Sequence, residues 1–543
     1  MMKFGLQGTV IGWQDPWAGD ASDRVMRTGT GSIYPSQDPI PTPGAFLDYL
    51  KQLRTDIYVH HVFPGLEGQA ELLADIRKHG IELCLGNEYG NINGPWTPGT
   101  NRYDLPDEAI LAAADQGVLC GLLYDEPEHL QINAAQYRKD SWHPHWGAAS
   151  ESASAVPTDQ LETAVVRAVS DRVRHVDTLL GEHRRVPLIA EHVFPVMFHA
   201  HARGGMALCP KIMKESFQPL QLSTALGAAR QYDVPLWICA DLWGPDVGAW
   251  PIRTPGFPGH SPAEFASALR MGYYMGPTHL FTENIDALAR FDGERFRSTV
   301  FGEIWEAFVR EYVPAHPIDW THADAVADIV LIHGDDSNYG QQERPFGHRA
   351  TPMPETSQSV FAAWHLLSHG TIPAHGSCLH IPGYSFPRHE LKRQVPGDRF
   401  PLMEGLRLAE PPAVHPLFQP LRSTLVLDGY AREDQLGAPQ LIVVAGSFVS
   451  PDTLRAVRKR AEAGARVLIA EGLAPEPWQT AARFDGGGVW LPAADLLGDA
   501  ARELAEPLIG PADCWTQRFR DREVRIYPQD SDGYELAFEI AKG

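Results

Sequence analysis

Cysteine is scarce in this chain, with 6 among 543 residues, too few for a disulfide scaffold in a protein of this length. No two of the cysteines have the C-x-x-C spacing of a zinc or redox site. Cys84, Cys120 and Cys239 lie within apolar runs, where a thiol packs as a small hydrophobic group. We therefore expect all six cysteines to be reduced and structural.

Basic residues are outnumbered, with 46 Lys and Arg against 68 Asp and Glu and a formal net charge of −22. An acidic chain without a basic block argues against nucleic acid or an anionic membrane as the main partner. No stretch approaches the roughly 18 apolar residues of a membrane span. The first residues lack the charged flank and the long apolar run of a signal peptide. We expect a soluble, cytoplasmic protein.

Nucleotide-binding sequences are also missing. No G-x-G-x-x-G follows an apolar run, and no Walker sequence occurs. Composition is otherwise ordinary, with 44% hydrophobic and 21% charged residues, so the chain is globular and long enough for two to four domains. We expect no cofactor.

Short apolar runs alternate with helical stretches through the first 320 residues. Such runs are typical of parallel strands that are buried on both faces, and eight of them predict a (β/α)₈ barrel over residues 1–320. The eight runs are Phe4–Trp13, Asp56–Phe63, Ile81–Glu88, Val118–Asp125, Val186–Val193, Met206–Lys211, Pro235–Asp241 and His279–Glu283. Residues 194–205 are short for a full helix, which leaves open whether both the fifth and the sixth run are barrel strands.

Two helix starts support this barrel. Asp159, three residues before Glu162, forms a plausible capping box ahead of a helical apolar stripe. Ser261-Pro262 offers an N-cap and a first-turn proline.

The pattern changes after residue 320. Ala327–His333 is expected to be a strand and Val360–Leu367 a helix. Strand Leu441–Ala445, a helix opened by Ser450-Pro451 and strand Arg466–Ala470 then form a βαβ unit. We expect a doubly wound, Rossmann-like domain over 321–480 and a small β-rich segment over 481–543.

Carboxylates gather where the barrel strands end. Because the active residues of such barrels come from these ends, the acidic residues there are candidate site residues. They are Glu88, Asp125, Glu126, Glu191, Glu215, Asp241 and Glu283. Any single one could cap a helix or pair with a base, but like charges in one cavity are costly unless a substrate, metal or proton uses them.

Tryptophans in the strand-to-helix loops give a second indication. Flat apolar rings around a carboxylate-lined cavity suit the C–H faces of a sugar, although long loops also need aromatic plugs. These residues are Trp13, Trp17, Trp96, Trp142, Trp146, Trp243 and Trp250, whereas Trp237 and Trp305 are expected in the core. Carboxylates with aromatic platforms predict glycoside chemistry, in which two carboxyl groups share the work.

The order of a barrel followed by a Rossmann-like domain around Leu441–Ala470 resembles the family 42 β-galactosidases and their clan A relatives. In that family the second domain resembles a glutamine amidotransferase without its cysteine and mediates trimer contacts; here Ala445-Gly446-Ser447 stands at the strand end. Gly121–Pro127 resembles the strand that ends in Asn-Glu, with Asp125 in place of Asn, and Pro235–Asp241 resembles the strand with the nucleophile. The resemblance implies a homo-oligomer, a trimer or dimer.

Roles follow from this resemblance. Glu126 would be the general acid and Asp241 the nucleophile or base, with Glu283 or Glu215 as alternative partners of Glu126. Glu88, Asp125, Glu191, Glu215 and Glu283 would hold hydroxyl groups. Trp13, Trp96 and Trp243 would stack on the carbohydrate substrate. Lys211 could bind a substrate carboxylate or pair with Glu215.

Two alternatives from other classes remain open. His143-Pro144-His145 and His199-Ala200-His201 have the H-x-H spacing with which two imidazoles on one strand face could hold a metal near Asp241 or Glu191. The second alternative is a carbohydrate-binding protein on an inactive barrel.

Overall fold

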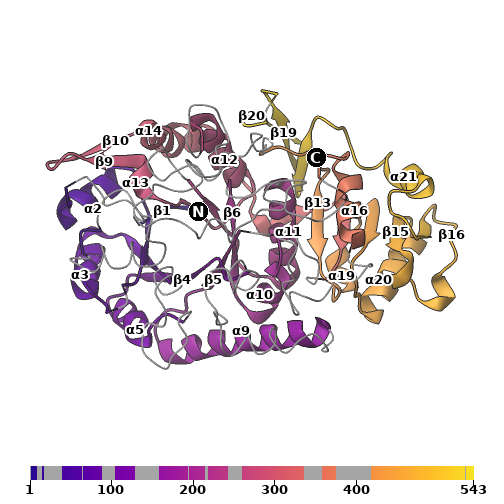
Figure 1. Ribbon diagram of the computed structural model, residues 1–543, viewed down its shortest axis with the longest axis horizontal. Helices are drawn as coiled ribbons and strands as arrows, with labels where there is room; N and C mark the ends of the chain where they lie inside the picture. The colour runs from indigo at the N-terminus through magenta and orange to yellow at the C-terminus, as the bar shows by residue number, and fades with distance from the viewer. Residues whose placement is uncertain are drawn as a thin grey trace, which may run out of the picture.

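The computed structural model describes residues 2–8, 15–17, 39–63, 65–87, 104–128, 158–193, 195–213, 218–242, 260–334, 358–372, 374, 417–531 and 533–542. Figure 1 shows a ring of strands and helices, coloured indigo to magenta, beside an orange and yellow region that holds the second half of the fold. No helix in the described part of the chain is both long and apolar enough to cross a membrane.

Eight parallel strands close into a barrel in chain order, with β8 pairing with β1. The strands are β1 (Lys3–Gln7), β2 (Ile57–His61), β3 (Glu82–Gly86), β4 (Leu119–Asp125), β5 (Leu188–His192), β6 (Ala207–Ile212), β7 (Trp237–Ala240) and β8 (His279–Thr282). Each predicted apolar run overlaps one of them, with β1 beginning one residue before its run and β6 ending one residue after, so the predicted barrel is confirmed. The fifth and sixth runs are both correct, because the seven residues of α10 (Phe198–Gly204) are enough to join them.

Helices surround the barrel (Figure 1). They are α2 (Pro43–Gln52), α3 (Gln69–His79), α5 (Asp107–Asp115), α9 (Thr158–Leu180), α10, α11 (Gln218–Tyr232), α12 (Pro262–Tyr274), α13 (Ile285–Leu288) and α14 (Val300–Ala307). The helix predicted from Asp159 is α9, which begins at Thr158, so Asp159 lies within the helix and is not its N-cap residue. Ser261 caps α12 as predicted, because its hydroxyl accepts a hydrogen bond from the Glu264 backbone N–H at 3.1 Å.

The lower barrel interior is apolar. A Cβ on Gly5 would lie 2.3 Å from Ile57 Cγ1, so Gly5 faces inward where there is no room for a side chain. The inward cluster consists of Ile57, Val59, Cys84, Cys120, Leu123, Ile189, Ala207, Cys209, Trp237, Cys239 and Phe281. Burial raises the pKa of these thiols, which are all free, so the structural role expected of Cys84, Cys120 and Cys239 is confirmed.

A second, six-stranded sheet follows, in the order β13-β12-β14-β15-β17-β16, and all its neighbours are parallel except β16 and β17. Its strands are β12 (Ile329–Ile332), β13 (Thr424–Leu427), β14 (Leu441–Val444), β15 (Arg466–Ala470), β16 (Ala482–Arg483) and β17 (Val489–Ala493), and its helices are α16 (Gln358–Leu367), α19 (Glu433–Leu436), α20 (Pro451–Glu462) and α21 (Asp499–Ala505). The predicted βαβ unit is confirmed, with Ser450 accepting from the Thr453 N–H.

Smaller β elements complete the chain. The β-rich segment expected near the C-terminus contains β18 (Trp515–Phe519), β19 (Arg522–Pro528) and β20 (Leu536–Lys542), which form an antiparallel sheet with β11 (Ala325–Val326). A hairpin of β9 (Ala289–Phe291) and β10 (Phe296–Ser298) follows β8. Short helical segments are the π-helix η2 (Phe308–Tyr312), the α-helix α15 (Val313–Ala315) and the 3₁₀-helices η3 (His322–Asp324), η5 (Glu471–Leu473) and η6 (Glu476–Trp478). The domain boundaries at 320 and 480 stay predictions.

Helix α11 lies between the barrel and β13 (Figure 1). Gly227 permits the close approach, because a Cβ there would lie 1.8 Å from Val426 O. Asp428, directly after β13, accepts from Gln231 Nε2 at 2.6 Å and from the Tyr232 hydroxyl. The Asp428 carboxylate, at the end of a strand of the open sheet, therefore binds that sheet to helix α11 of the barrel.

Candidate functional site

Polar side chains line the upper barrel interior, at the carboxyl ends of the strands. Side chains alternate along a strand, so the residue two positions past an inward apolar residue also faces inward. On β5, for example, Glu191 follows the inward Ile189, and on β6 Lys211 follows the inward Cys209. We call the resulting set the mouth ring; it comprises Gln7, His61, Asp125, Glu191, Lys211, Asp241 and Glu283.

Lys211 stands at the centre of the carboxylates. Its Nζ lies 2.8 Å from Glu283 Oε2 and 3.6 Å from Glu191 Oε2. It also donates hydrogen bonds at 3.2 Å to Asp125 Oδ1 and to Glu126 Oε1. One ammonium group thus joins acids from the ends of β4, β5 and β8.

Negative charge exceeds positive charge in this cluster. Burial raises the pKa of Glu191 well above its usual range, and the charges of Asp125 and Asp241 raise it further while Lys211 opposes them. Burial and the charge of Asp241 likewise raise the pKa of Glu283. Protons therefore remain on carboxyl groups of this site at pH values where an exposed glutamate has lost its own.

Lys211 keeps its charge in this setting. Burial by itself would lower its pKa, but the charges of Glu191 and Glu283, followed by Asp125 and Glu126, raise it well above the usual value. A lysine nucleophile needs the opposite shift, so Lys211 is a fixed cation. A substrate carboxylate at Lys211 would lie beside Glu191 and Glu283, whose charges would repel it. The binding of an acidic sugar by Lys211 stays a prediction.

Asp241 and Glu283 form a second pair. Their side chains share a hydrogen bond, and Asp241 is completely buried at the end of β7. Two adjacent carboxyl groups in a buried site share a proton, since both cannot ionise at low cost. Through Glu283 and Lys211, Asp241 is linked to Glu126 across the barrel mouth.

Glu126 stands at a strained turn. It follows β4 directly and has a φ of +45°, in the left-handed region that residues with a Cβ seldom adopt. Asn87 fixes the strand end, because its Oδ1 accepts a hydrogen bond from the Asp125 backbone N–H at 2.8 Å. Asp125 and Glu126 are each 8% exposed, against 0% for Glu191 and Asp241, so they are the carboxyl groups most open to a ligand.

The structure brings most of the predicted site residues together. Asp125, Glu126, Glu191, Lys211, Asp241 and Glu283 all belong to this one cluster. The other predicted site residues, Glu88, Glu215, Trp13, Trp96 and Trp243, lie outside the described residues. Trp17 is not a sugar platform: it is buried against Phe46, and its indole N–H donates to Asp75 Oδ2 at 3.0 Å.

Sequence reasoning missed Gln7 and His61. His61 ends β2, and its ring fills the space beside Gly86, where an added Cβ would lie 2.4 Å from Nδ1. Burial, with the nearby His60 and Lys211, lowers its pKa well below the usual range, so the ring is neutral. The structure shows that Gly5 and Val59 face inward, and alternation then places both side chains inside the barrel, two positions further along.

A metal ion has one candidate place among the described residues. Glu191, Cys239 and Glu283 offer ligand atoms that all lie within 4.8 Å of one another. The Lys211 ammonium lies 2.8 Å from Glu283 Oε2, so a cation there would compete with it.

The histidine pair His199-Ala200-His201 is not part of this cluster. The pair belongs to helix α10, not to a strand, and residues two apart on a helix point in different directions. His199 Nε2 lies 3.1 Å from Val426 O, and His201 Nδ1 lies 3.0 Å from His192 Nε2. The shared strand face expected for this pair is therefore wrong, and the pair His143-Pro144-His145 lies outside the described residues.

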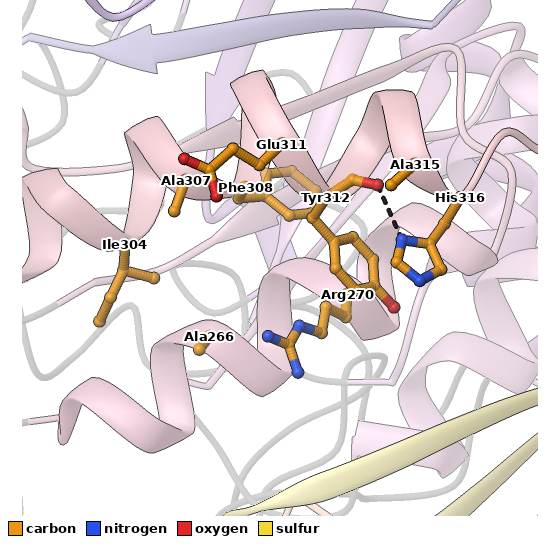
Figure 2. Close-up of a pocket in the computed structure, with 9 residues that line it drawn as sticks. All are labelled: Ala266, Arg270, Ile304, Ala307, Phe308, Glu311, Tyr312, Ala315 and His316. Atoms are coloured by element: carbon orange, nitrogen blue, oxygen red, sulfur yellow. Dashed lines mark hydrogen bonds between the residues drawn. The ribbon is translucent and has the colours of Figure 1, made fainter.

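A cavity of about 380 Å³ lies elsewhere, among the outer helices α12, α14, η2 and α15. Figure 2 shows Tyr312 in it between Arg270, whose guanidinium carbon is 4.7 Å from the ring centroid, and the stacked ring of His316. No residue of the mouth ring lines this cavity. It is a feature of the helical layer.

Comparisons with known proteins show similarity in backbone fold and not in sequence. No family model and no curated protein sequence matches the chain. Among solved structures it is similar to a β-galactosidase from the psychrophilic Marinomonas ef1, with a TM-score of 0.48 and 10% identity over 97% of this chain and 95% of that one. It is also similar to the exo-β-1,4-mannosidase Op5Man5 from Opitutaceae bacterium strain TAV5, with a TM-score of 0.44 and 14% identity over 89% and 78%.

A third similar structure is Saccharomyces cerevisiae Gas2p in complex with laminaritriose and laminaritetraose, with a TM-score of 0.32 and 12% identity over 52% of this chain and 61% of that one. The first two neighbours are glycosidases by name, as the resemblance noted in the sequence implies, and membership of family 42 is not among these findings. Similarity at this level adds no argument about chemistry, which depends on the side chains of the barrel mouth.

Proposed function

We propose that this chain is a glycoside hydrolase that cleaves an O-glycosidic bond with two carboxyl groups. One observation carries the proposal: acids from β4, β5 and β8 surround the single ammonium of Lys211 at the carboxyl end of a closed barrel, and Asp241 extends the cluster through Glu283. Burial raises the pKa values of Glu191 and Glu283, so protons remain on carboxyl groups of this cluster above the pH at which an exposed glutamate loses its own. Glycoside hydrolysis needs such a site, with one carboxylic acid and one carboxylate.

Glu126 is the proposed general acid. It is among the most exposed carboxyl groups of the cluster, and the turn at φ +45° holds it at the rim, where a leaving-group oxygen would arrive. Asp241 is the proposed nucleophile or water-activating base, since it lies deeper and shares a hydrogen bond with Glu283. Glu283 is the alternative partner of Glu126.

Lys211 is proposed to hold the carboxylates in position. Its contacts with Glu126 and Glu283 fix both side chains, and its positive charge limits the repulsion among them. Asp125 and Glu191 would then accept hydrogen bonds from substrate hydroxyl groups.

The domain around the six-stranded sheet β12–β17 is proposed to be an amidotransferase-like assembly domain, as the family 42 resemblance implies, in a cytoplasmic homo-oligomer. Light scattering at micromolar concentration tests the assembly. A dimer or trimer is expected, and a monomer at every concentration would contradict it.

The activity is tested with a panel of nitrophenyl α- and β-glycosides, including galactosides, mannosides and glucosides, together with oligosaccharides. We expect hydrolysis of at least one, unchanged by EDTA, and abolished in the double variant Glu126→Gln/Asp241→Asn. Activity lost with EDTA and restored by a divalent metal would instead favour a metal-dependent hydrolase. Sugar binding without hydrolysis would favour an inactive barrel.

A further inference from the structure

Gln7 is a buried polar side chain that the proposed mechanism does not use. It ends β1, two positions after Gly5, which faces the inner cluster at Ile57 and Phe281. Alternation along the strand therefore turns Gln7 into the barrel as well. In the barrel, Gln7 pairs with Val59 on β2. On the other side, Leu6 pairs with Thr282 of β8, so Gln7 lies at the level of the next residue, Glu283.

The amide of Gln7 has no partner within the described protein. The residue is 0% exposed, and neither Nε2 nor Oε1 makes a hydrogen bond. A buried amide without a partner destabilises a folded chain, because it loses its bonds to water and gains none in return. An apolar side chain of the same size would avoid this loss.

Other buried glutamines show the contrast. Gln231 Nε2 donates to Asp428 Oδ1 at 2.6 Å, and its Oε1 accepts from the Asp428 N–H at 3.0 Å. Gln221 Nε2 donates to His192 O and Val193 O at 2.9 and 3.1 Å, and only its Oε1 makes no hydrogen bond. Gln7 differs from both in facing the site.

We propose that Gln7 is a specificity-determining residue whose amide binds one hydroxyl group of the sugar in the barrel mouth. This rests on the proposed function for the nature of the ligand. The amide can accept from a hydroxyl through Oε1 and donate to it through Nε2, so a bound sugar supplies the bonds that the amide lacks among the described residues. A sugar without that hydroxyl leaves the amide unpaired and is rejected, as other sites built for a hydroxyl reject its deoxy analogue.

The test is Gln7→Met, which keeps the length of the side chain and removes the amide. We expect the melting temperature to rise by about 1–3 °C, because the unpaired amide is gone. We expect kcat/KM to fall roughly 10- to 100-fold on the best glycoside. Gln231→Met is the matched control; it should lower the melting temperature and leave kcat/KM within twofold.

Monodeoxy glycosides measure discrimination between sugars, which would not change if the role of Gln7 were only structural. The wild type should discriminate against the analogue that lacks one particular hydroxyl, and Gln7→Met should lose that discrimination while keeping it at the other positions. A fall in melting temperature like that of Gln231→Met would overturn the proposal, since the amide would then be bonded within the protein. Equal discrimination in both proteins at every position would also overturn it.

The proposed function can fail separately. If the wild type hydrolyses none of the glycosides, thermal stabilisation by galactose, mannose and glucose replaces the kinetics. Stabilisation of the wild type that Gln7→Met loses would uphold the role of Gln7 without hydrolysis. No stabilisation of the wild type, or equal stabilisation of both proteins, would overturn it.

Discussion

The two ends of the barrel differ in how their buried or partly buried carboxyl groups are paired with cations. At the amino-terminal end, Glu82 on β3 pairs with Lys3 on β1 and with Arg184, whose Nη1 lies 3.2 Å away. Burial tends to raise the pKa of Glu82, but its hydrogen bonds to the two cations lower it overall. At the carboxyl-terminal end, several acids share Lys211, and the pKa values of Glu191 and Glu283 are raised.

This contrast separates a structural charge from a functional one. Glu82, with 29% of its side chain exposed, has its countercharges in place and favours the folded chain by a modest amount. The upper cluster is buried and lacks enough countercharge among the described residues, so part of it stays protonated. Buried carboxyl groups that lower stability at only one end of the barrel are expected if the active site lies at that end.

The largest effect is expected from Lys211→Met. Without its ammonium the buried carboxylates have no countercharge in the described site, and the free energy of unfolding at pH 7 should fall by about 3–5 kcal/mol. Protonation relieves this repulsion, so the loss should shrink toward pH 5. Urea unfolding at both pH values measures it, and an equal loss at both would contradict the account.

Opposite pH dependences are expected for Glu283→Gln and Glu82→Gln. The folded-state pKa of Glu283 is raised, so this carboxyl reduces stability increasingly as pH rises above the ordinary value of 4.5. Glu283→Gln should therefore gain stability relative to the wild type above that pH, by at most about 1.4 kcal/mol per pH unit.

The folded-state pKa of Glu82 is lowered, so its contribution is present above 4.5 and is lost as pH falls. Glu82→Gln should lose up to about 1 kcal/mol at pH 7 and nothing near pH 3. Melting temperatures from pH 3 to 9 check both variants, and parallel curves would break the comparison.

A smaller effect is expected from Lys3→Met, the counterpart of Lys211→Met at the other end. Arg184 still faces Glu82, and Lys3 is partly exposed, so the loss should stay within about 1 kcal/mol. Urea unfolding and kcat/KM are measured together. A loss as large as that of Lys211→Met, or a change in kcat/KM above twofold, would show that the ends are not distinct.

The smallest effect is expected from Arg270→Ala in the outer cavity of Figure 2. It removes a cation–π contact with Tyr312, which contributes about 0.5–1 kcal/mol at exposed sites. Stability should fall by no more than this, and kcat/KM should not change. A loss of activity would mean that the cavity acts on the barrel mouth.

The barrel could be predicted from the sequence because each parallel strand is an almost continuous apolar run. The carboxyl ends of such strands meet at one rim, so Asp125, Glu191 and Glu283 could also be grouped in advance. Continuous apolar runs hide the alternation that turns Gln7 and His61 inward. Which acids reach Lys211 depends on the register between β4, β5, β6 and β8. The sequence of a single strand does not contain this register, so these contacts could not be predicted.

The central claim concerns Glu126 and is tested by Glu126→Gln with two kinds of substrate. Removing a general acid costs about 10²–10⁴-fold, and the loss should be much smaller on a fluoride or dinitrophenyl glycoside, whose leaving group needs little protonation. Asp241→Asn should be poor on both. Near-wild-type hydrolysis of oligosaccharides by Glu126→Gln, with Glu283→Gln inactive, would contradict the assignment of the acid.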